Sequence, residues 1–354
     1  MPFDHNTRTT RGTAVPIVDD VAYEQQAGAG QFDVSRTGTL VYRRATGGAS
    51  ALTRLDASGK REPLRARPGM YLGLRLSPDG RQVALRVSDA GGQDIYVYDL
   101  ERDVMTRLTF GGGQYTSPAW SPDGHYVVFA SVGNGIFQAR ADGASLPQAL
   151  THSQTFQTPG SFTPDGKRLA YFESLGGVGQ LWTVSLNEED GHLTAGTAER
   201  FLTSSASDSY PSFSPDGRWL AYASTEAGAT DVFVRAFPQP VSGSGSRWQI
   251  STNGGTAPVW SRSGHDLFYQ SGDQIMAASY AVMGDTFVPG KPSVWATKIA
   301  APGPNAPVWD LAPDGKRVAL LTPVDSSDGS KQEHEVVLLQ NFFDELRRRV
   351  PLGK

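Results

Sequence analysis

The chain has 354 residues, a formal net charge of −4, 40 glycines, 23 prolines and no cysteine. This length allows one large domain or two ordinary ones, and the lack of cysteine excludes disulfides, thiolate metal sites and a cysteine nucleophile. The slight negative charge argues against electrostatic binding of nucleic acid, and no apolar run is long enough to cross a membrane.

The chain begins with a polar segment, which we expect to form a flexible tail over residues 1–13. No apolar stretch typical of a signal peptide is visible there, so a complete chain of this sequence is expected in the cytoplasm, whereas a fragment would leave the location open. The next residues, Ala14 to Val18, are mostly apolar and predict a first strand.

One tetrapeptide then recurs along the chain in seven intact or altered copies. Its copies are SRTG at 35–38, SPDG at 77–80, SPDG at 121–124, TPDG at 163–166, SPDG at 214–217, SRSG at 261–264 and APDG at 312–315. Their starts lie 42 to 51 residues apart. A period of about 40 to 50 residues is typical of four-stranded propeller blades.

Each copy follows an apolar residue and precedes a short run rich in β-branched, aromatic and other apolar residues, as in Val127-Val128-Phe129. Proline presets φ at the first turn position, aspartate bonds nearby backbone N–H groups, and glycine accepts the positive φ. The tetrapeptide is therefore predicted to join the first two strands of each blade. Gly124→Val and Gly217→Val should destabilise the protein.

These repeats predict an all-β chain, with one seven-bladed β-propeller of four-stranded antiparallel blades over residues 14–341. The seventh blade would take its first three strands from Val308–Leu311, Val318–Leu321 and Val336–Leu339, and its missing outer strand from Ala14–Val18. Such pairing closes the ring and protects the sheet edges. Six blades with a degenerate flank is the alternative.

The segments PAWSPDGHYVVFAS and PSFSPDGRWLAYAST resemble the Pro-Asp-Gly class of WD-like propeller repeats, as found in the TolB propeller. The phrases DVFVRAFPQP and WQISTNGGTAPVWS are similar to the propeller half of some bacterial serine/threonine kinases. The resemblance covers residues 14 to 340. It implies a propeller fold and a role as docking platform, sensor or gatekeeper of a peptidase, without selecting among them.

Catalytic motifs are sparse, so no catalytic residue is assigned. No G-x-S-x-G elbow is complete. The six histidines are dispersed, which makes a histidine metal site unexpected. Calcium in the axial channel is the one cofactor considered, with carboxylates in candidate loops at Asp89, Glu173, Asp208 and Glu226. An alternative function is a metal-assisted hydrolase or lyase, if Asp208, Glu173 and His152 converge.

A ligand of a propeller usually binds where loops of different blades meet at the axis. We expect that mouth on the face opposite the tetrapeptide turns. Its candidate ligand-binding residues are neutral amides, tyrosines and one carboxylate: Gln114, Tyr115, Gln157, Asp208, Tyr210, Asn253 and Asn305. Such a rim favours a non-catalytic binding or sensing role toward a protein, peptide or small polar ligand such as a carbohydrate.

The chain ends with NFFDELRRRV and a short tail. We expect residues 342–354 to form a C-terminal tail, with a short element packed on the last blade and solvated arginines. The alternative is a docking tail for an acidic partner. We expect a monomer.

Overall fold

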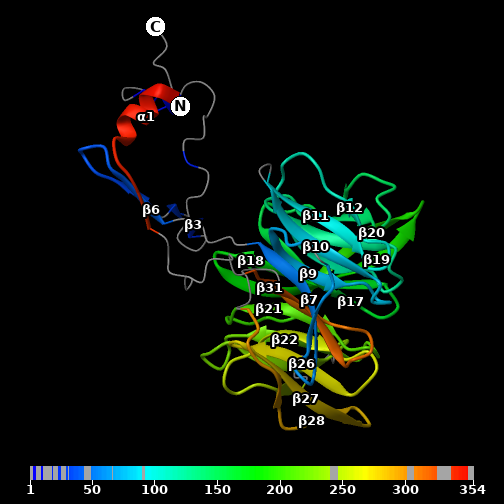
Figure 1. Ribbon diagram of the computed structural model, residues 1–354. Coiled ribbons are helices and arrows are strands. Elements are labelled where there is room, and N and C mark those ends of the chain that lie inside the picture. Colours follow the sequence, from blue (N-terminus) through cyan, green and yellow to red (C-terminus); the bar gives the residue numbers. More distant parts are fainter. Residues whose placement is uncertain are drawn as a thin grey trace. The chain divides into compact units, whose positions relative to one another are not determined.

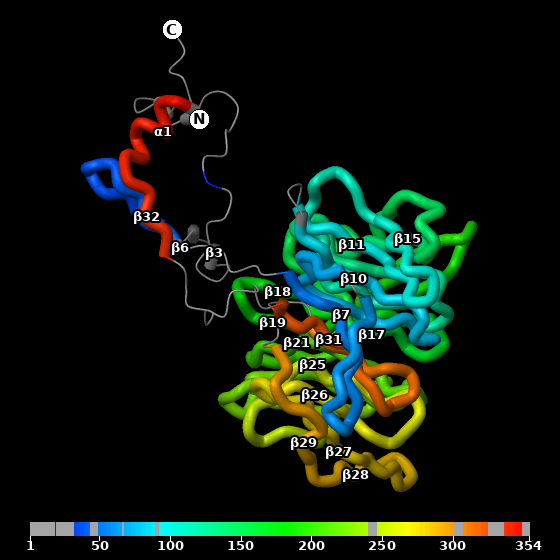
Figure 2. The backbone as a smooth tube through the Cα atoms, viewed as in Figure 1, coloured from blue at the N-terminus to red at the C-terminus, as the bar shows by residue number. Residues whose placement is uncertain are grey.

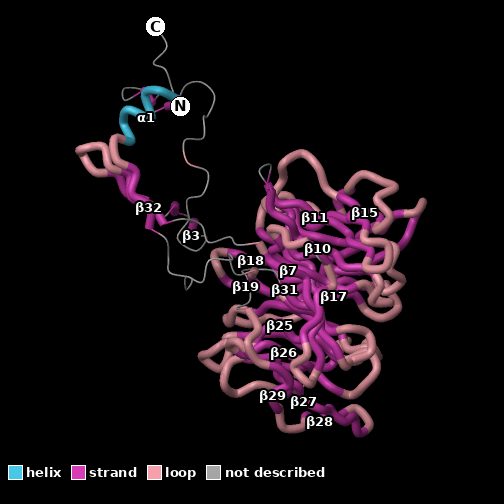
Figure 3. Tube along the Cα trace, in the orientation of Figure 1, coloured by secondary structure: helices cyan, strands magenta, loops and turns pink. Residues whose placement is uncertain are grey.

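The computed structural model describes residues 32–43, 49–65, 67–89, 92–239, 246–300, 307–324 and 336–349, with a few short pieces before residue 31. The chain divides into two compact units. One unit is Ala49–Val324, and the other joins Met1–Gly48 to Asp325–Lys354. Strands predominate in the described residues, which include one short helix (Figure 3). None of these residues forms a helix with the length and apolarity that crossing a bilayer requires.

The larger unit contains six antiparallel sheets, which we number as blades 1 to 6. Blade 1 is β9 (Tyr71–Leu76), β10 (Gln82–Asp89), β11 (Gly92–Asp99) and β12 (Val104–Arg107). Blade 2 is β13 (Tyr115–Trp120), β14 (Tyr126–Ser131), β15 (Gly135–Arg140) and β16 (Gln148–Ala149). Blade 3 is β17 (Phe156–Phe162), β18 (Arg168–Leu175), β19 (Val178–Glu189) and β20 (His192–Arg200).

The remaining three blades follow the same order, with one addition. Blade 4 is β21 (Asp208–Phe213), β22 (Trp219–Ser224), β23 (Asp231–Ala236) and β24 (Arg247–Gln249). Blade 5 is β25 (Thr256–Trp260), β26 (Asp266–Ser271), β27 (Gln274–Met283) and β28 (Thr286–Pro289), with β29 (Ser293–Ala296) also paired to β27. Blade 6 is β30 (Trp309–Leu311), β31 (Arg317–Pro323), β7 (Ser50–Asp56) and β8 (Arg61–Pro63).

The first strand of each blade packs against the first strand of the next one. This series runs β9, β13, β17, β21, β25 and β30, and β30 contacts β9 again. Of these strands, β9, β17 and β21 are labelled in Figure 1. The buried side chains lie between neighbouring blades, where the two apolar faces of each sheet are covered. The predicted all-β propeller of four-stranded antiparallel sheets is therefore confirmed.

The closure differs from the predicted one. In blade 6, β7 pairs with β31 over seven residues, from Asp56 opposite Arg317 to Ser50 opposite Pro323 (Figure 2). Leu52 and Leu55 of β7 are almost completely buried in the adjoining core. The N-terminal side thus supplies two strands, β7 and β8. The predicted outer strand, 14–18, lies outside the described residues except for Val18.

The first tetrapeptide copy, at 35–38, and the strand at 336–339 belong to the other unit. There β32 (Val336–Leu339) pairs with β6 (Leu40–Arg43), and β6 pairs with β5 (Phe32–Val34). The prediction of Val336–Leu339 as the third strand of the last blade is wrong, because its pairing partner is β6 and the place beside β31 is taken by β7. The described residues of the larger unit form six sheets, as in the alternative prediction.

The smaller unit also contains the helix. Besides the three-stranded sheet it holds two short hairpins, β1 (Phe3–Asp4) with β2 (Thr9–Thr10) and β3 (Tyr23–Glu24) with β4 (Ala29–Gly30). The helix α1 (Phe342–Arg349) follows β32. Its first backbone N–H, that of Phe342, donates to Gly38 O at 2.7 Å. The predicted terminal element is thus a helix, and it contacts the first turn copy.

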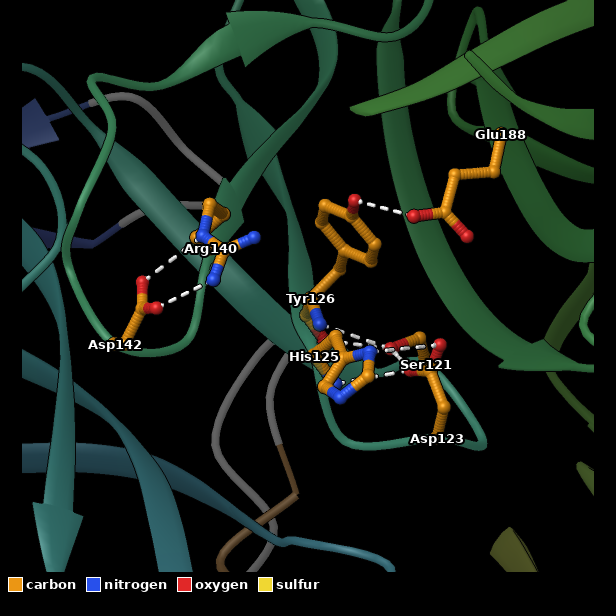
Figure 4. Close-up of polar contacts among 7 residues, drawn as sticks. All are labelled: Ser121, Asp123, His125, Tyr126, Arg140, Asp142 and Glu188. Atoms are coloured by element: carbon orange, nitrogen blue, oxygen red, sulfur yellow. Dashed lines mark hydrogen bonds and ion pairs between the residues drawn. The ribbon is translucent and has the colours of Figure 1, made fainter. Parts of the chain in front are cut away.

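The tetrapeptide turns have the predicted chemistry, which Figure 4 shows for blade 2. Asp123 accepts the backbone N–H of His125 at 2.9 Å and the Ser121 hydroxyl at 2.5 Å. Ser121 Oγ in turn accepts the backbone N–H of Tyr126 at 2.9 Å. The serine therefore holds both the aspartate and the start of the second strand, a role that the sequence analysis did not assign.

Of the two turn glycines chosen from the sequence, Gly124 and Gly217, Gly217 has less room for a side chain. Its φ is +71°, and a Cβ there would lie 3.1 Å from Pro164 Cδ in the preceding turn. At Gly124 the nearest such contact is 3.7 Å. We expect Gly217→Val to lower the free energy of unfolding by about 1–3 kcal/mol, and Gly217→Asn to cost less. Urea denaturation measures both, and equal stability of wild type and Gly217→Val would contradict the turn geometry.

Candidate functional site

An axial cavity of about 400 Å³ lies among the first strands of the blades. All six of these strands, or the turns next to them, contribute to its lining. From blades 1 to 3 the lining residues are Arg75, Leu76, Pro78, Ser117, Pro118, Ala119, Trp120, Pro122, Thr158, Pro159, Gly160, Ser161, Phe162, Pro164 and Phe172. From blades 4 to 6 they are Tyr210, Pro211, Ser212, Phe213, Ser214, Pro215, Pro258, Val259, Trp260, Arg262, Pro307 and Asp310.

The edges of the inner strands that line the cavity are interrupted by proline. In β13, β21 and β25 the ladder to the second strand shifts register around Pro118, Pro211 and Pro258. The residues before these prolines have positive φ, namely Ser117 (55°), Tyr210 (52°) and Ala257 (50°). Proline donates no backbone hydrogen bond, so these edges cannot template a full additional strand. Ligand specificity must then depend on side chains and on selected backbone groups.

Side chains link neighbouring inner strands and hold the cavity wall. Trp120 Nε1 donates to Arg75 O at 3.0 Å, and Trp260 Nε1 donates to Ser212 O at 2.9 Å. Between blade 1 and blade 6, where the ring closes, the backbone N–H of Leu76 donates to Asp310 Oδ2 at 2.9 Å. Trp120 and Trp260 are the apolar residues that precede two copies of the tetrapeptide. In each case the indole N–H also binds the inner strand of the preceding blade.

Few ionisable groups face the cavity. Its lining contains two arginines, Arg75 and Arg262, and one carboxylate, Asp310. The Arg75 Nη1 atom lies 4.0 Å from Asp310 Oδ1, at the limit of an ion pair. Arg262 occupies the proline position of its turn, and its Nη1 donates to Pro78 O at 2.7 Å. The lining carries a formal charge of +1 in a chain of net charge −4.

Among the predicted rim residues that the structure describes, Tyr210 alone lines this cavity. Gln114 and Asn253 are exposed on their loops, and Tyr115 packs edge-on against Phe129 with ring centroids 5.6 Å apart. Asn305 lies outside the described residues. The cavity lining instead includes residues of five tetrapeptide turns, Pro78, Pro122, Pro164, Ser214 to Pro215 and Arg262. The cavity therefore extends to the turn face, opposite the predicted mouth.

Gln157 and Asp208, two further predicted rim residues, are buried. Gln157 accepts the Thr151 hydroxyl at 2.5 Å and donates to Glu173 Oε1 at 3.1 Å. Asp208 is hydrogen-bonded to the Ser224 side chain within blade 4. The structure thus places both side chains inside the blades and not on an open rim, because their polar groups are satisfied by neighbouring strands.

Burial raises the pKa of Asp208 against the opposing effects of Ser224, Arg235 and Arg200. The folded protein therefore binds the Asp208 proton more tightly than the unfolded chain, whose carboxyl pKa is about 3.9. Stability should fall as the pH rises through the interval between these two pKa values, and the loss persists at neutral pH.

Asp208→Asn removes this ionisation and is expected to raise the urea midpoint at pH 7. The difference from wild type should shrink toward pH 3, where both states of the wild-type chain are protonated. Urea titrations at the two pH values measure the effect. A variant that is less stable than wild type at pH 7 would show that the carboxylate is stabilising as an ion.

The residues that the enzyme hypothesis would bring together are engaged elsewhere or exposed. Glu173 accepts hydrogen bonds from Ser153, Thr155 and Gln157, and His152 is exposed. Across the described residues, no three histidine, aspartate or glutamate side chains cluster in a way that could hold a metal ion. Of the calcium candidates, Glu226 forms an ion pair with Arg247.

Sequence reasoning missed the cavity residues Arg75, Thr158, Arg262 and Asp310. One signal was available, since SRSG puts arginine where five other copies have proline. It also missed two buried aspartates of the third strands. Asp94 accepts the Thr109 hydroxyl at 2.6 Å, and Asp231 accepts the Ser251 hydroxyl at 2.7 Å. These pairs tie the third strand to the residues just after the fourth strand, so their role is structural.

Comparison with known proteins agrees with this architecture. Residues 39–191 match the family model of the TolB beta propeller domain. The chain is 29% identical over 199 residues to the Tol-Pal system protein TolB of Gluconobacter oxydans, covering 40% of this chain and 44% of that protein. It is 28% identical over 193 residues to TolB of Francisella tularensis, covering 52% and 43%. The match thus spans less than half of each relative.

A solved structure described as a TolB from Agrobacterium tumefaciens has the same fold. It superposes with a TM-score of 0.57 at 20% identity, covering 78% of this chain and 99% of that one. The relatives also correct one expectation. TolB of the Tol-Pal system is periplasmic, so the cytoplasmic location expected for a complete chain is wrong. The repeats and the six sheets identify this chain as a β-propeller, and the segment 39–191 is similar to the TolB beta propeller domain.

Proposed function

We propose that the chain is a non-catalytic binding protein that takes up an extended segment of another protein in the axial cavity, from the face of the tetrapeptide turns. The observation that carries this proposal is the cavity itself. It is lined by all six blades, and its volume of about 400 Å³ falls in the range of ligand pockets, roughly 300–1,000 Å³.

The chemistry of the lining supports binding more than catalysis. Aromatic and proline side chains alternate with small hydroxyl-bearing residues, as in Trp120, Pro122 and Ser117. General acid–base chemistry needs a titratable group near the working pH. The described lining offers two arginines and one aspartate that accepts two backbone N–H groups. Such a surface suits an extended peptide, which presents apolar side chains and backbone polar groups together.

TolB-like propellers bind proteins, which favours a protein segment over a carbohydrate as the ligand. The relatives named above belong to the Tol-Pal system. For this chain we therefore propose a protein partner in an assembly of that kind. The partner is recognised through the turn face of the propeller.

A selection from a phage-displayed library of random linear peptides against the purified chain tests this proposal. Enriched peptides should bind wild type and lose binding to Val259→Trp, which fills the cavity from the half-buried Val259. Pro164→Trp, at an exposed turn position on the lining, is the second variant in case the first fails to fold. No enrichment, or enriched peptides that bind both variants as well as wild type, would contradict the proposal.

A further inference from the structure

We infer that the bound segment is acidic, and that an aspartate or glutamate side chain of the partner is received by Arg75 and Thr158 inside the axial cavity, with Arg262 at its turn-face end. This inference rests on the proposed function, since it names the chemistry of the segment that the same cavity takes up.

The guanidinium of Arg75 has a hydrogen-bond donor that no acceptor in the protein satisfies. Its side chain is 19% exposed, and its buried Nη1 atom has no hydrogen-bond partner. The nearby Asp310 is already engaged, because Oδ2 accepts the backbone N–H of Leu76 at 2.9 Å and Oδ1 accepts that of Leu311 at 3.0 Å. The Asp310 carboxylate thus links blade 6 to blade 1, and the Nη1 atom of Arg75, a residue of the cavity lining, is left without an acceptor in the protein.

Thr158 supplies a second unused group in the same lining. The residue is 3% exposed, and its Oγ1 atom is buried without a hydrogen-bond partner. A buried donor without an acceptor costs about 1–3 kcal/mol, and more when it is charged. Two such groups in one cavity favour a ligand that brings acceptor oxygens. A carboxylate provides them, and its hydrogen bonds with a guanidinium are roughly twice as strong as neutral ones.

Arg262 extends the positive character to the turn face. It replaces the turn proline of the other blades, is exposed, and reaches the carbonyl oxygens of Pro78 and Ser77 in blade 1. No carboxylate of the described residues lies within ion-pair distance of its guanidinium. An acidic segment that enters from this face would meet Arg262 first. Because the chain as a whole is negative, this charge is local to the cavity.

The test uses the peptides selected above. In an unbiased library the peptides that need the open cavity should be enriched in aspartate and glutamate and depleted in lysine and arginine. For a synthetic copy of one such peptide with an amidated C-terminus, replacing its acidic residues by asparagine and glutamine should weaken binding about tenfold. If the peptide binds equally well with an amidated and with a free C-terminus, the cavity recognises the side-chain carboxylates and not the terminal carboxylate.

Variants of the protein complete a double-mutant cycle. Arg75→Gln should weaken the binding of the acidic peptide about tenfold. It should also abolish the difference in affinity between this peptide and the one that carries asparagine and glutamine in place of its acidic residues. Arg262→Gln, at an exposed position, should reduce affinity several-fold and lower its salt dependence. Arg102→Gln, an exposed arginine outside the lining, is the charge-matched control and should change neither.

The two proposals fail differently. If peptide binding needs the open cavity but the selected peptides are not acidic, or Arg75→Gln and Arg262→Gln leave the acidic peptide unaffected, this inference is wrong and the proposed function stands. If the peptides bind Val259→Trp and Pro164→Trp as well as wild type, the proposed function itself is wrong.

Discussion

A chain that starts at Arg65 and ends at Val324 is expected to lose the cooperative unfolding transition that a chain of residues 49–324 retains. The only difference between the two chains is the segment 49–64, which contains β7 and β8. Without it, blade 6 keeps two strands, β30 and β31, and β31 loses its seven-residue partner. We expect the shorter chain to expose apolar surface and to aggregate or bind a hydrophobic dye.

The size of this effect follows from what β7 buries. Leu52 is 0% and Leu55 is 2% exposed, and both belong to a core that also contains Trp309 and Leu320. Burial of one leucine contributes roughly 1.5–3 kcal/mol, and the whole stability of a domain is about 5–15 kcal/mol. Losing two such side chains together with a strand ladder therefore removes a large fraction of the stability.

The matched control is the longer truncated chain, which lacks residues 1–48 and 325–354. These residues form a separate compact unit, so their removal should leave the thermal transition of the propeller close to that of the full chain. A synthetic peptide of residues 49–64 added to the 65–324 chain should restore part of the transition. Equal melting curves for the 49–324 and 65–324 chains would contradict the closure by β7.

Trp219→Ala is expected to be the most damaging single substitution in the core of blades 4 and 5, at about 3–5 kcal/mol. Trp219 is 1% exposed, and its ring lies 5.4 Å from that of Trp248 and 5.3 Å from that of Phe287 between centroids. Phe287 comes from β28 of blade 5. Alanine would leave a cavity where three aromatic rings from two blades meet.

Trp219→Phe is the informative comparison. The Trp219 Nε1 atom is buried and has no hydrogen-bond partner, so the indole contributes packing and no bond. Phenylalanine keeps most of the aromatic contact and removes an unsatisfied donor. We expect its cost to be well below that of alanine in chemical denaturation. A phenylalanine variant as unstable as the alanine variant would mean that the indole N–H has a partner that the structure does not show.

The repeat made the fold predictable because its chemistry is local. Serine, proline, aspartate and glycine make a complete turn within five residues, as Ser121 and Asp123 do, so every copy marks the same junction of strands. The closure was not predictable in this way. Strands β7 and β8 are the third and fourth strands of blade 6 and carry no tetrapeptide, while the copy at 35–38 marks a sheet outside the ring.

The candidate site was the less predictable part, for a related reason. Loop residues such as Asp208 and Gln157 were expected on a rim, but the start of each inner strand is already enclosed by neighbouring strands. The charges of the cavity depend on contacts between blades. Leu76 and Asp310 are separated by 234 residues in the sequence, and Asp310 becomes a neighbour of Leu76 and Arg75 only through the closure of the ring.

Oxidative cross-linking of paired cysteines tests the ring most directly, because the natural chain contains no cysteine. Ala51 and Thr322 are register partners in β7 and β31. The double variant Ala51→Cys with Thr322→Cys should form its disulfide rapidly under brief oxidation, whereas Ala51→Cys with Arg317→Cys should remain reduced, since Arg317 pairs with Asp56 at the other end of the ladder. A 51–322 pair that stays reduced, or that closes no faster than the 51–317 pair, would contradict the six-sheet ring closed by the strand at 50–56.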